Sequence, residues 1–177
     1  MLFTKITTVL VAAFAAQSWA ATFSSATDAI GTLEPINNSI EKIVGEIKKS
    51  PGGMTELLTI AGSIYSVCDQ AQAGLNKLEG MGHFTPEDEK KGNPHMQKLT
   101  TGLTDAVDAT AGKVDMIKAV PGGPFIAQRV AECVRKAKTR LVFILQSKSS
   151  AQSYQKHMPA IKNFDKKYDA VIKDMMS

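Results

Sequence analysis

The chain has 177 residues, of which 44% are hydrophobic and 21% charged, and its formal net charge is +4. This length suits one domain with a substantial apolar core. Beyond a short run at residues 6–16, no apolar run approaches the roughly 20 residues of a membrane-spanning helix, which excludes an integral membrane protein. The charge is uneven, because residues 121–177 carry 11 basic and 4 acidic side chains. Either this basic third attracts anionic partners, or it is a solvated surface that offsets an acidic remainder.

The first twenty residues have the pattern of a cleaved secretory signal. Lys5 precedes a short apolar run over residues 6–16, and small residues, Ser18 and Ala20, flank Trp19 before the expected cut. The sequence therefore predicts a signal peptide over residues 1–20 and a single domain over residues 21–177. We expect a secreted, extracellular protein, for which the cell wall is a further location.

Five stretches repeat apolar residues at helical spacing. They cover residues 29–47, 54–78, 96–117, 126–144 and 154–175, and no stretch alternates as a strand does. Thr85 followed by Pro86 is typical of a helix start, and Ser149-Ser150 indicates the last corner. The fold class predicted is all-α, a bundle of about five amphipathic helices.

A Pro-Gly-Gly triplet occurs twice, at residues 51–53 and 121–123. A shift of 70 residues superposes the two triplets and also aligns Leu33 with Leu103 and Val44 with Val114. This register predicts two helix–Pro-Gly-Gly–helix hairpins followed by a C-terminal helix. Chance similarity between amphipathic helices is the alternative explanation.

The two cysteines of an exported chain predict one disulfide, Cys68–Cys133, although two buried free thiols are an alternative. Cys68 lies 15 residues after Gly53, whereas Cys133 lies 10 after Gly123. The bridge therefore requires the second and fourth helices to be neighbours offset by about 7 Å, rather than a diagonal pair.

No pattern in the chain indicates catalysis. The sequence lacks the glycine-rich and nucleophile motifs of common enzymes, and His83 and His95 do not have the spacing of a metal site. We expect no enzyme activity, no cofactor and no metal. The basic run from Arg135 to Arg140 lacks interleaved aromatic residues, so we expect no nucleic-acid partner. Asn37-Asn38-Ser39 is a sequon, which predicts a glycan at Asn37 on the flank of the first helix.

The inward helix faces mix small residues with methionine, which favours a cavity for an acyl chain. A closed bundle, in which alanines allow close helix approach, is the alternative. The candidate cavity residues are Leu57, Ala61, Ile64, Leu103, Val114, Ile117, Val130, Ala137, Phe143, Ile161 and Phe164. A basic residue at its mouth, Arg129, Arg135 or Arg140, is the candidate contact for a carboxylate.

The chain resembles the fungal family of hydrophobic surface binding protein A and the cell-wall galactomannoproteins. The resemblance lies in the arrangement of DAIGTLEPINNSIEKIVGEI, a Gly-Gly corner, a Thr-Pro-Glu break, KLTTGLTDAVDATAGKVDMIKAV and a final MPAIKNFDKKYDAVIKDM. It implies a helical bundle that adsorbs to hydrophobic surfaces and, in some members, holds an acyl chain. It implies no catalytic residues.

The sequence therefore predicts a secreted, non-enzymatic binder of a fatty acid, another lipid or a hydrophobic surface. The alternative is an effector-like interaction protein that contacts a host or cell-wall partner through its basic C-terminal helices, with Lys162, Lys166 and Lys167 in the contact. A third hypothesis is a helical protein that acts on membranes.

Overall fold

The computed structural model describes residues 31–177, and this part of the chain is all-helical. Its helices are α3 (Leu33–Lys49), α4 (Met54–Gly80), α5 (Pro86–Ala111), α6 (Val114–Ala119), α7 (Gly123–Lys148) and α8 (Ala151–Met176). The predicted all-α class is confirmed, with five long helices and one short one. The predicted signal peptide lies outside the described residues.

The expected helix starts are present at the two corners where the sequence indicated them. The Thr85 hydroxyl accepts a hydrogen bond from the Asp88 amide at 3.2 Å, and the Asp88 carboxylate accepts one from the Thr85 amide at 2.8 Å. These reciprocal bonds satisfy two backbone donors at the start of α5. Ser150 caps α8 in a similar way, through a hydrogen bond from the Ser153 amide.

The third apolar stretch, residues 96–117, was predicted to be one helix. The structure has two helices there. Gly112 ends α5, and α6 begins two residues later at Val114. Glycine weakens a helix at its position because its backbone loses more conformational entropy there than that of any other residue. The six-residue α6 therefore adds a short segment between α5 and the second Pro-Gly-Gly corner.

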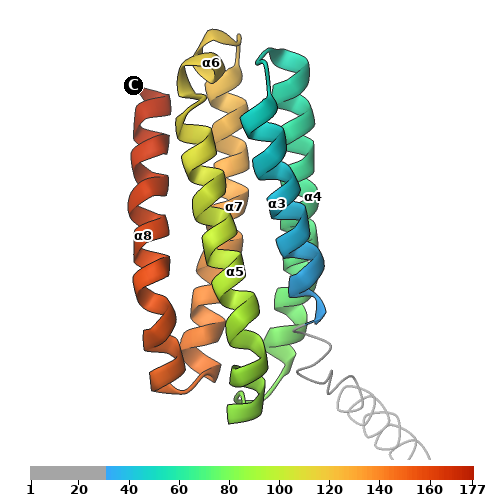
Figure 1. Cartoon of the computed structure of the whole chain (residues 1–177), viewed down its shortest axis with the longest axis vertical. Helices are drawn as coiled ribbons and strands as arrows, with labels where there is room; N and C mark the ends of the chain where they lie inside the picture. Colours follow the sequence, from blue (N-terminus) through green and yellow to red (C-terminus); the bar gives the residue numbers. More distant parts are fainter. Residues whose placement is uncertain (1–30) are drawn as a thin grey trace, which may run out of the picture.

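The five long helices form a ring in which each one packs mainly against two neighbours. The neighbouring pairs are α4–α3, α3–α5, α5–α8, α8–α7 and α7–α4. In Figure 1, α3, α5 and α8 lie in the nearer layer and α4 and α7 lie behind them. Both Pro-Gly-Gly corners, α6 and the C-terminus lie at one end, the top of Figure 1, which we call the corner end.

The two helix–Pro-Gly-Gly–helix units differ in how their helices pack. In the first unit α3 packs against α4. In the second unit α5 packs mainly against α3 and α8, and α7 packs mainly against α4 and also contacts α8. The C-terminal helix therefore lies between the two arms of the second unit, and α6 spans the wider gap at the corner end by packing against α7 and α8.

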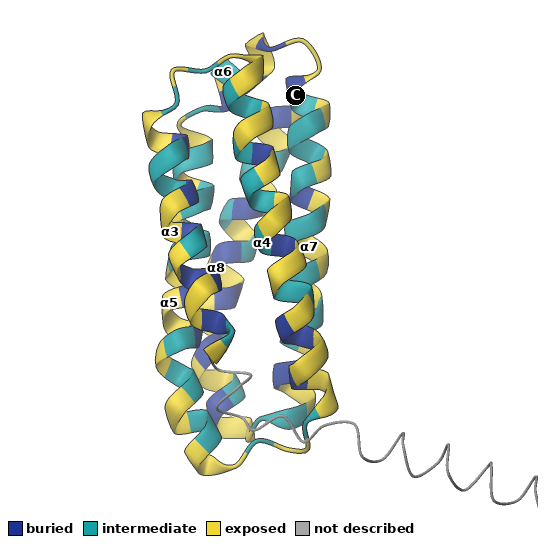
Figure 2. Ribbon diagram, turned by 90° about the vertical axis from the view of Figure 1, so that its right-hand side faces the viewer, coloured by how far each residue is buried: buried dark blue, intermediate teal, exposed yellow. Residues whose placement is uncertain are grey.

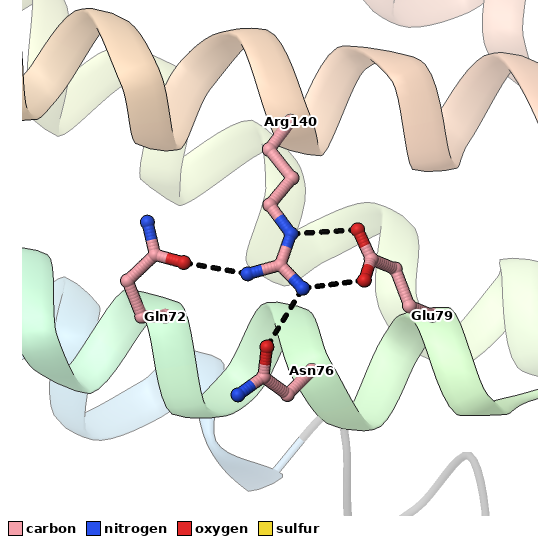
Figure 3. A network of polar contacts seen from close by, with 4 residues as sticks. All are labelled: Gln72, Asn76, Glu79 and Arg140. Atoms are coloured by element: carbon pink, nitrogen blue, oxygen red, sulfur yellow. Dashed lines mark hydrogen bonds and ion pairs between the residues drawn. The ribbon is translucent and has the colours of Figure 1, made fainter.

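The predicted bridge between the second and fourth helices is present. Cys68 of α4 and Cys133 of α7 form a disulfide, with their Cα atoms 6.4 Å apart. Further along the same pair of helices, Figure 3 shows the Arg140 guanidinium reaching from α7 to three side chains of α4. It donates to Gln72 Oε1 at 2.5 Å, to Asn76 Oδ1 at 2.7 Å and to Glu79 Oε1 at 2.6 Å. A covalent and a polar link thus join α4 to α7.

A buried apolar cluster lies at the end of the bundle opposite the corner end. It is formed by Leu75, Leu78 and Ile144, and Phe84 packs against it. Ile144 is 1% exposed and is the only large side chain of the described residues below 2%. Figure 2 shows buried positions distributed along the inner faces of the bundle, with partly exposed ones between them. We call the end around Ile144 the closed end.

A polar contact between α5 and α8 includes a buried histidine. His157 is hydrogen-bonded through Nε2 to Asn93 Oδ1 at 2.8 Å, and the Ser153 hydroxyl donates to the same oxygen at 3.3 Å. Burial, together with the nearby Lys156 charge, lowers the pKa of His157 below its ordinary 6.5, and Glu89 opposes this shift. His157 is therefore held neutral in the folded protein.

Replacing both cysteines, as Cys68→Ser with Cys133→Ser, is expected to lower the free energy of unfolding by about 4 kcal/mol. The reason is that a closed loop of 65 residues restricts the unfolded chain. Urea unfolding followed by circular dichroism measures the change. The prediction is wrong if the oxidised wild type and the double variant unfold at the same urea concentration.

His157 predicts a loss of stability in acid. The unfolded chain has the ordinary pKa of 6.5 and the folded state a lower one, so below pH 6.5 the unfolded state binds more protons. The stabilising contribution is complete above pH 6.5 and decreases as the pH falls toward the lowered folded value. Urea unfolding between pH 8 and pH 5 should show a weaker pH dependence in His157→Gln than in the wild type. Parallel curves for the two proteins would contradict the assignment.

Candidate apolar ligand site

A cavity of about 260 Å³ lies inside the five-helix ring. All five long helices contribute side chains to it, and Met116 and Ile117 of α6 line it at the corner end. On α3 its lining extends from Leu33 to Ile47, which corresponds to about 21 Å at 1.5 Å per residue. The cavity is therefore elongated along the bundle axis. It is larger than the roughly 150 Å³ apolar cavity that is sufficient to bind benzene.

Small side chains at inward positions keep this space open. Ala61, Ala71, Ala106, Thr110 and Ala137, the small residues that the sequence placed on inward faces, all line the cavity. Each occupies a position where a leucine or phenylalanine would extend toward the axis. A hollow bundle is therefore favoured over a closed one, because larger neighbouring side chains do not fill the space left by these small residues.

The hydroxyl groups that line the cavity are satisfied within the protein. Thr100 donates to the Met96 carbonyl at 3.1 Å and Thr110 to the Ala106 carbonyl at 2.8 Å. The Tyr168 hydroxyl donates to the backbone carbonyl of Ala131, and burial raises the pKa of Tyr168 to about 12. Since these groups point their polar atoms at the backbone, the surface that a ligand meets is almost entirely apolar.

Most of the predicted cavity residues line the cavity. They are Leu57, Ala61, Ile64, Leu103, Ile117, Val130, Ala137, Ile161 and Phe164. Two do not. Val114 is 3% exposed and packed outside the lining, and Phe143 is 67% exposed on the outer surface of α7. Phe143 belongs to four consecutive apolar residues, 142–145, and these cannot all face inward because a helix turns 100° per residue.

The three arginines predicted to meet a carboxylate lie outside the cavity lining. Arg129 pairs with Glu132 at 3.3 Å and Arg135 with Asp169 at 3.3 Å, while Arg140 binds α4 as described above. Their long side chains follow the outer surface of α7, where carboxylates are available. The lysines that do line the cavity, Lys113 and Lys138, were missed. Lys113 follows the helix break at Gly112, a break that the stripe pattern concealed.

The predicted glycosylation site does not agree with the structure. Asn37 is 2% exposed, and its side-chain amide donates to the His95 carbonyl at 3.2 Å. The turn of α3 places Asn37 against α5, whereas a glycan requires an acceptor that projects into solvent. In the structure, Asn37 instead forms a polar contact between α3 and α5.

Within residues 31–177, no group of three or more His, Cys, Asp or Glu side chains is arranged to hold a metal ion. None of the helices in the same range has both the length and the apolar character needed to cross a bilayer.

Comparison with known proteins identifies the family. Residues 26–142 match the family model described as hydrophobic surface binding protein A. A comparison with curated protein sequences found no match.

Solved structures share the fold at low sequence identity. Afmp4p in complex with palmitic acid is 12% identical, with a TM-score of 0.78, covering 85% of this chain and 99% of that one. Ligand-binding domain 1 of the Penicillium marneffei MP1 protein, complexed with arachidonic acids, is 13% identical with a TM-score of 0.75 and covers 85% and 99%. Domain 2 of the same protein, also with arachidonic acids, is 12% identical with a TM-score of 0.75 and covers 87% and 94%. Because the family match spans well over half of the sequence, the chain belongs to the hydrophobic surface binding protein A family.

Proposed function

We propose that this protein is a secreted, non-enzymatic carrier that binds a long-chain fatty acid or a similar apolar molecule in its central cavity. The observation that carries the proposal is the elongated apolar cavity lined by all five long helices. A bilayer core about 30 Å thick contains two acyl chains end to end, so one chain spans about 15 Å. The lining along α3, at about 21 Å, is long enough for one such chain.

Burial of methylene groups supplies the binding energy. Each buried CH₂ contributes about 0.8 kcal/mol, so ten of them contribute about 8 kcal/mol before the costs of association. The cavity is formed before binding, because helices whose packing is already fixed line it on all sides. Little of the binding energy is then needed to order the protein.

The comparisons support this proposal. The similar solved structures were obtained in complex with palmitic acid or arachidonic acids, and their fold covers 85% or more of this chain. The family name refers to binding of hydrophobic surfaces. A long alkyl chain and a hydrophobic surface both present apolar area to be removed from water, so one apolar binding site suits either description.

The basic C-terminal third gives less support to the alternative of a charged docking surface. Lys167 pairs with Asp108 of α5 at 2.6 Å, and Arg140 pairs with Glu79 of α4. These pairs join the basic third to the acidic part of the chain. They favour the interpretation in which the basic third offsets the acidic remainder of the chain. Lys162 and Lys166 are exposed on α8.

Export and domain organisation are part of the same proposal. The pattern around Lys5 and residues 6–16 supports a cleaved signal over residues 1–20, with a single helical domain over residues 21–177. The cysteine bridge agrees with an oxidising destination.

Delipidated protein should bind a fluorescent long-chain fatty acid saturably at one site. Ala71→Phe should weaken this binding by about 50-fold, because its ring displaces about three methylenes of the ligand at about 0.8 kcal/mol each. Fluorescence titration and displacement by palmitic acid measure the affinities.

The matched control is Ala73→Phe, which adds the same ring two residues further along α4 at an exposed position. It should bind as the wild type does. Absence of saturable binding by the wild type would refute the proposed function, and equal weakening in both variants would refute the placement of the site.

A further inference from the structure

The cavity contains two cationic side chains, and their surroundings differ. Lys138 of α7 has its Nζ 2.8 Å from the Asp165 carboxylate of α8, so its charge is neutralised by a partner. Lys113 lies between α5 and α6, and its Nζ donates to the backbone carbonyl of Ser50 at 2.9 Å. Within residues 31–177 no carboxylate oxygen lies within 4 Å of the Lys113 Nζ, so this cation has a neutral acceptor only.

A cation beside an apolar cavity is stabilised more by an anion than by a carbonyl. A carboxylate adds Coulomb attraction between two opposite charges, which a neutral carbonyl lacks, and this attraction is stronger beside an apolar cavity than in water. The carbonyl of Ser50 leaves other ammonium protons of Lys113 available, because an ammonium group has three donors. Lys113 is partly buried, which limits how far water replaces a missing anion.

The position of Lys113 also defines the two ends of the cavity. Ser50, Gly52 and Gly53 line the cavity with it at the corner end. At the other end, Leu75 and Leu78 line the cavity and pack against Ile144 in the buried cluster. One end of the hollow is thus polar and cationic, and the other is apolar and filled by side chains.

We propose that Lys113 binds the ionised head group of the ligand, so that a fatty acid lies with its carboxylate at the Pro-Gly-Gly corner of α3–α4 and its alkyl tail toward the closed end. This inference rests on the proposed function and specifies it further. It makes the protein selective for a long-chain acid over a neutral molecule of the same length. Lys138 has no such role because Asp165 already occupies its ammonium group.

A matched pair of ligands tests this directly. Palmitic acid and hexadecanol have the same chain length and differ in the charge of the head group. At pH 8 the wild type should bind the acid about tenfold more tightly than the alcohol, since the alcohol has no charge to attract the Lys113 ammonium group. Lys113→Met should reduce this ratio to about one by weakening acid binding, with hexadecanol binding unchanged. Lys113→Arg should restore most of the preference.

Lys138→Met is the control, because it removes a lysine from the same cavity and should retain the preference for the acid. If Lys113 served only to cap the C-terminal end of α3, Lys113→Met would lower the melting temperature and change both affinities equally, which would overturn the assignment. An unchanged ratio in Lys113→Met, or a ratio lost in Lys138→Met, would also overturn it. Hexadecanol binding with no acid preference would leave the proposed function intact, whereas no binding of either ligand would reject both.

Discussion

Each long helix of the bundle packs mainly against two neighbours, and this five-helix ring determines where apolar side chains can go. Helix axes packed about 9 Å apart in a ring of five lie about 8 Å from its centre. A helix with its side chains has a radius of about 5–6 Å, so a channel of about 2–3 Å radius remains unless large side chains fill it. Alanine and threonine at the inward positions do not fill it. The cavity therefore follows from helix number and side-chain size together, rather than from imperfect packing.

Two features maintain the ring against collapse toward a four-helix arrangement. The Cys68–Cys133 bridge and the Arg140 contacts hold α4 beside α7, which closes the ring on one side. On the other side α8 separates α5 from α7, and the Tyr168 hydroxyl links α8 to the α7 backbone. These links fix which helices are neighbours around the ring.

Periodicity predicted the helices well because each stripe depends only on local spacing. The five stripes, the cap at Thr85 and the disulfide were all readable from the chain, and most of the inward residues were identified correctly. What periodicity does not contain is the order of helices around a ring. The placement of α8 between α5 and α7 depends on tertiary packing, and so does the outward direction of Phe143.

The cation proposed to bind the head group was missed for a related reason. Basic residues were sought where they are frequent, on α7, but carboxylates of the same helix and of α8 pair with Arg129 and Arg135 there. Lys113 is isolated in the sequence and becomes notable only because a helix break directs it to the end of α3. Tertiary packing also explains the error at Asn37. The sequon predicts an exposed asparagine, whereas the contact with α5 buries it.

The position of α8 has a consequence for how the molecule is made. Residues 151–176 leave the ribosome after α3 to α7 have been synthesised, so the wall between α5 and α7 is completed only when α8 is added. Without α8, the apolar inner faces of the earlier helices would form a trough open on that side. The order of synthesis thus gives a stage at which the future interior is reachable from the side, before α8 completes the ring around the cavity.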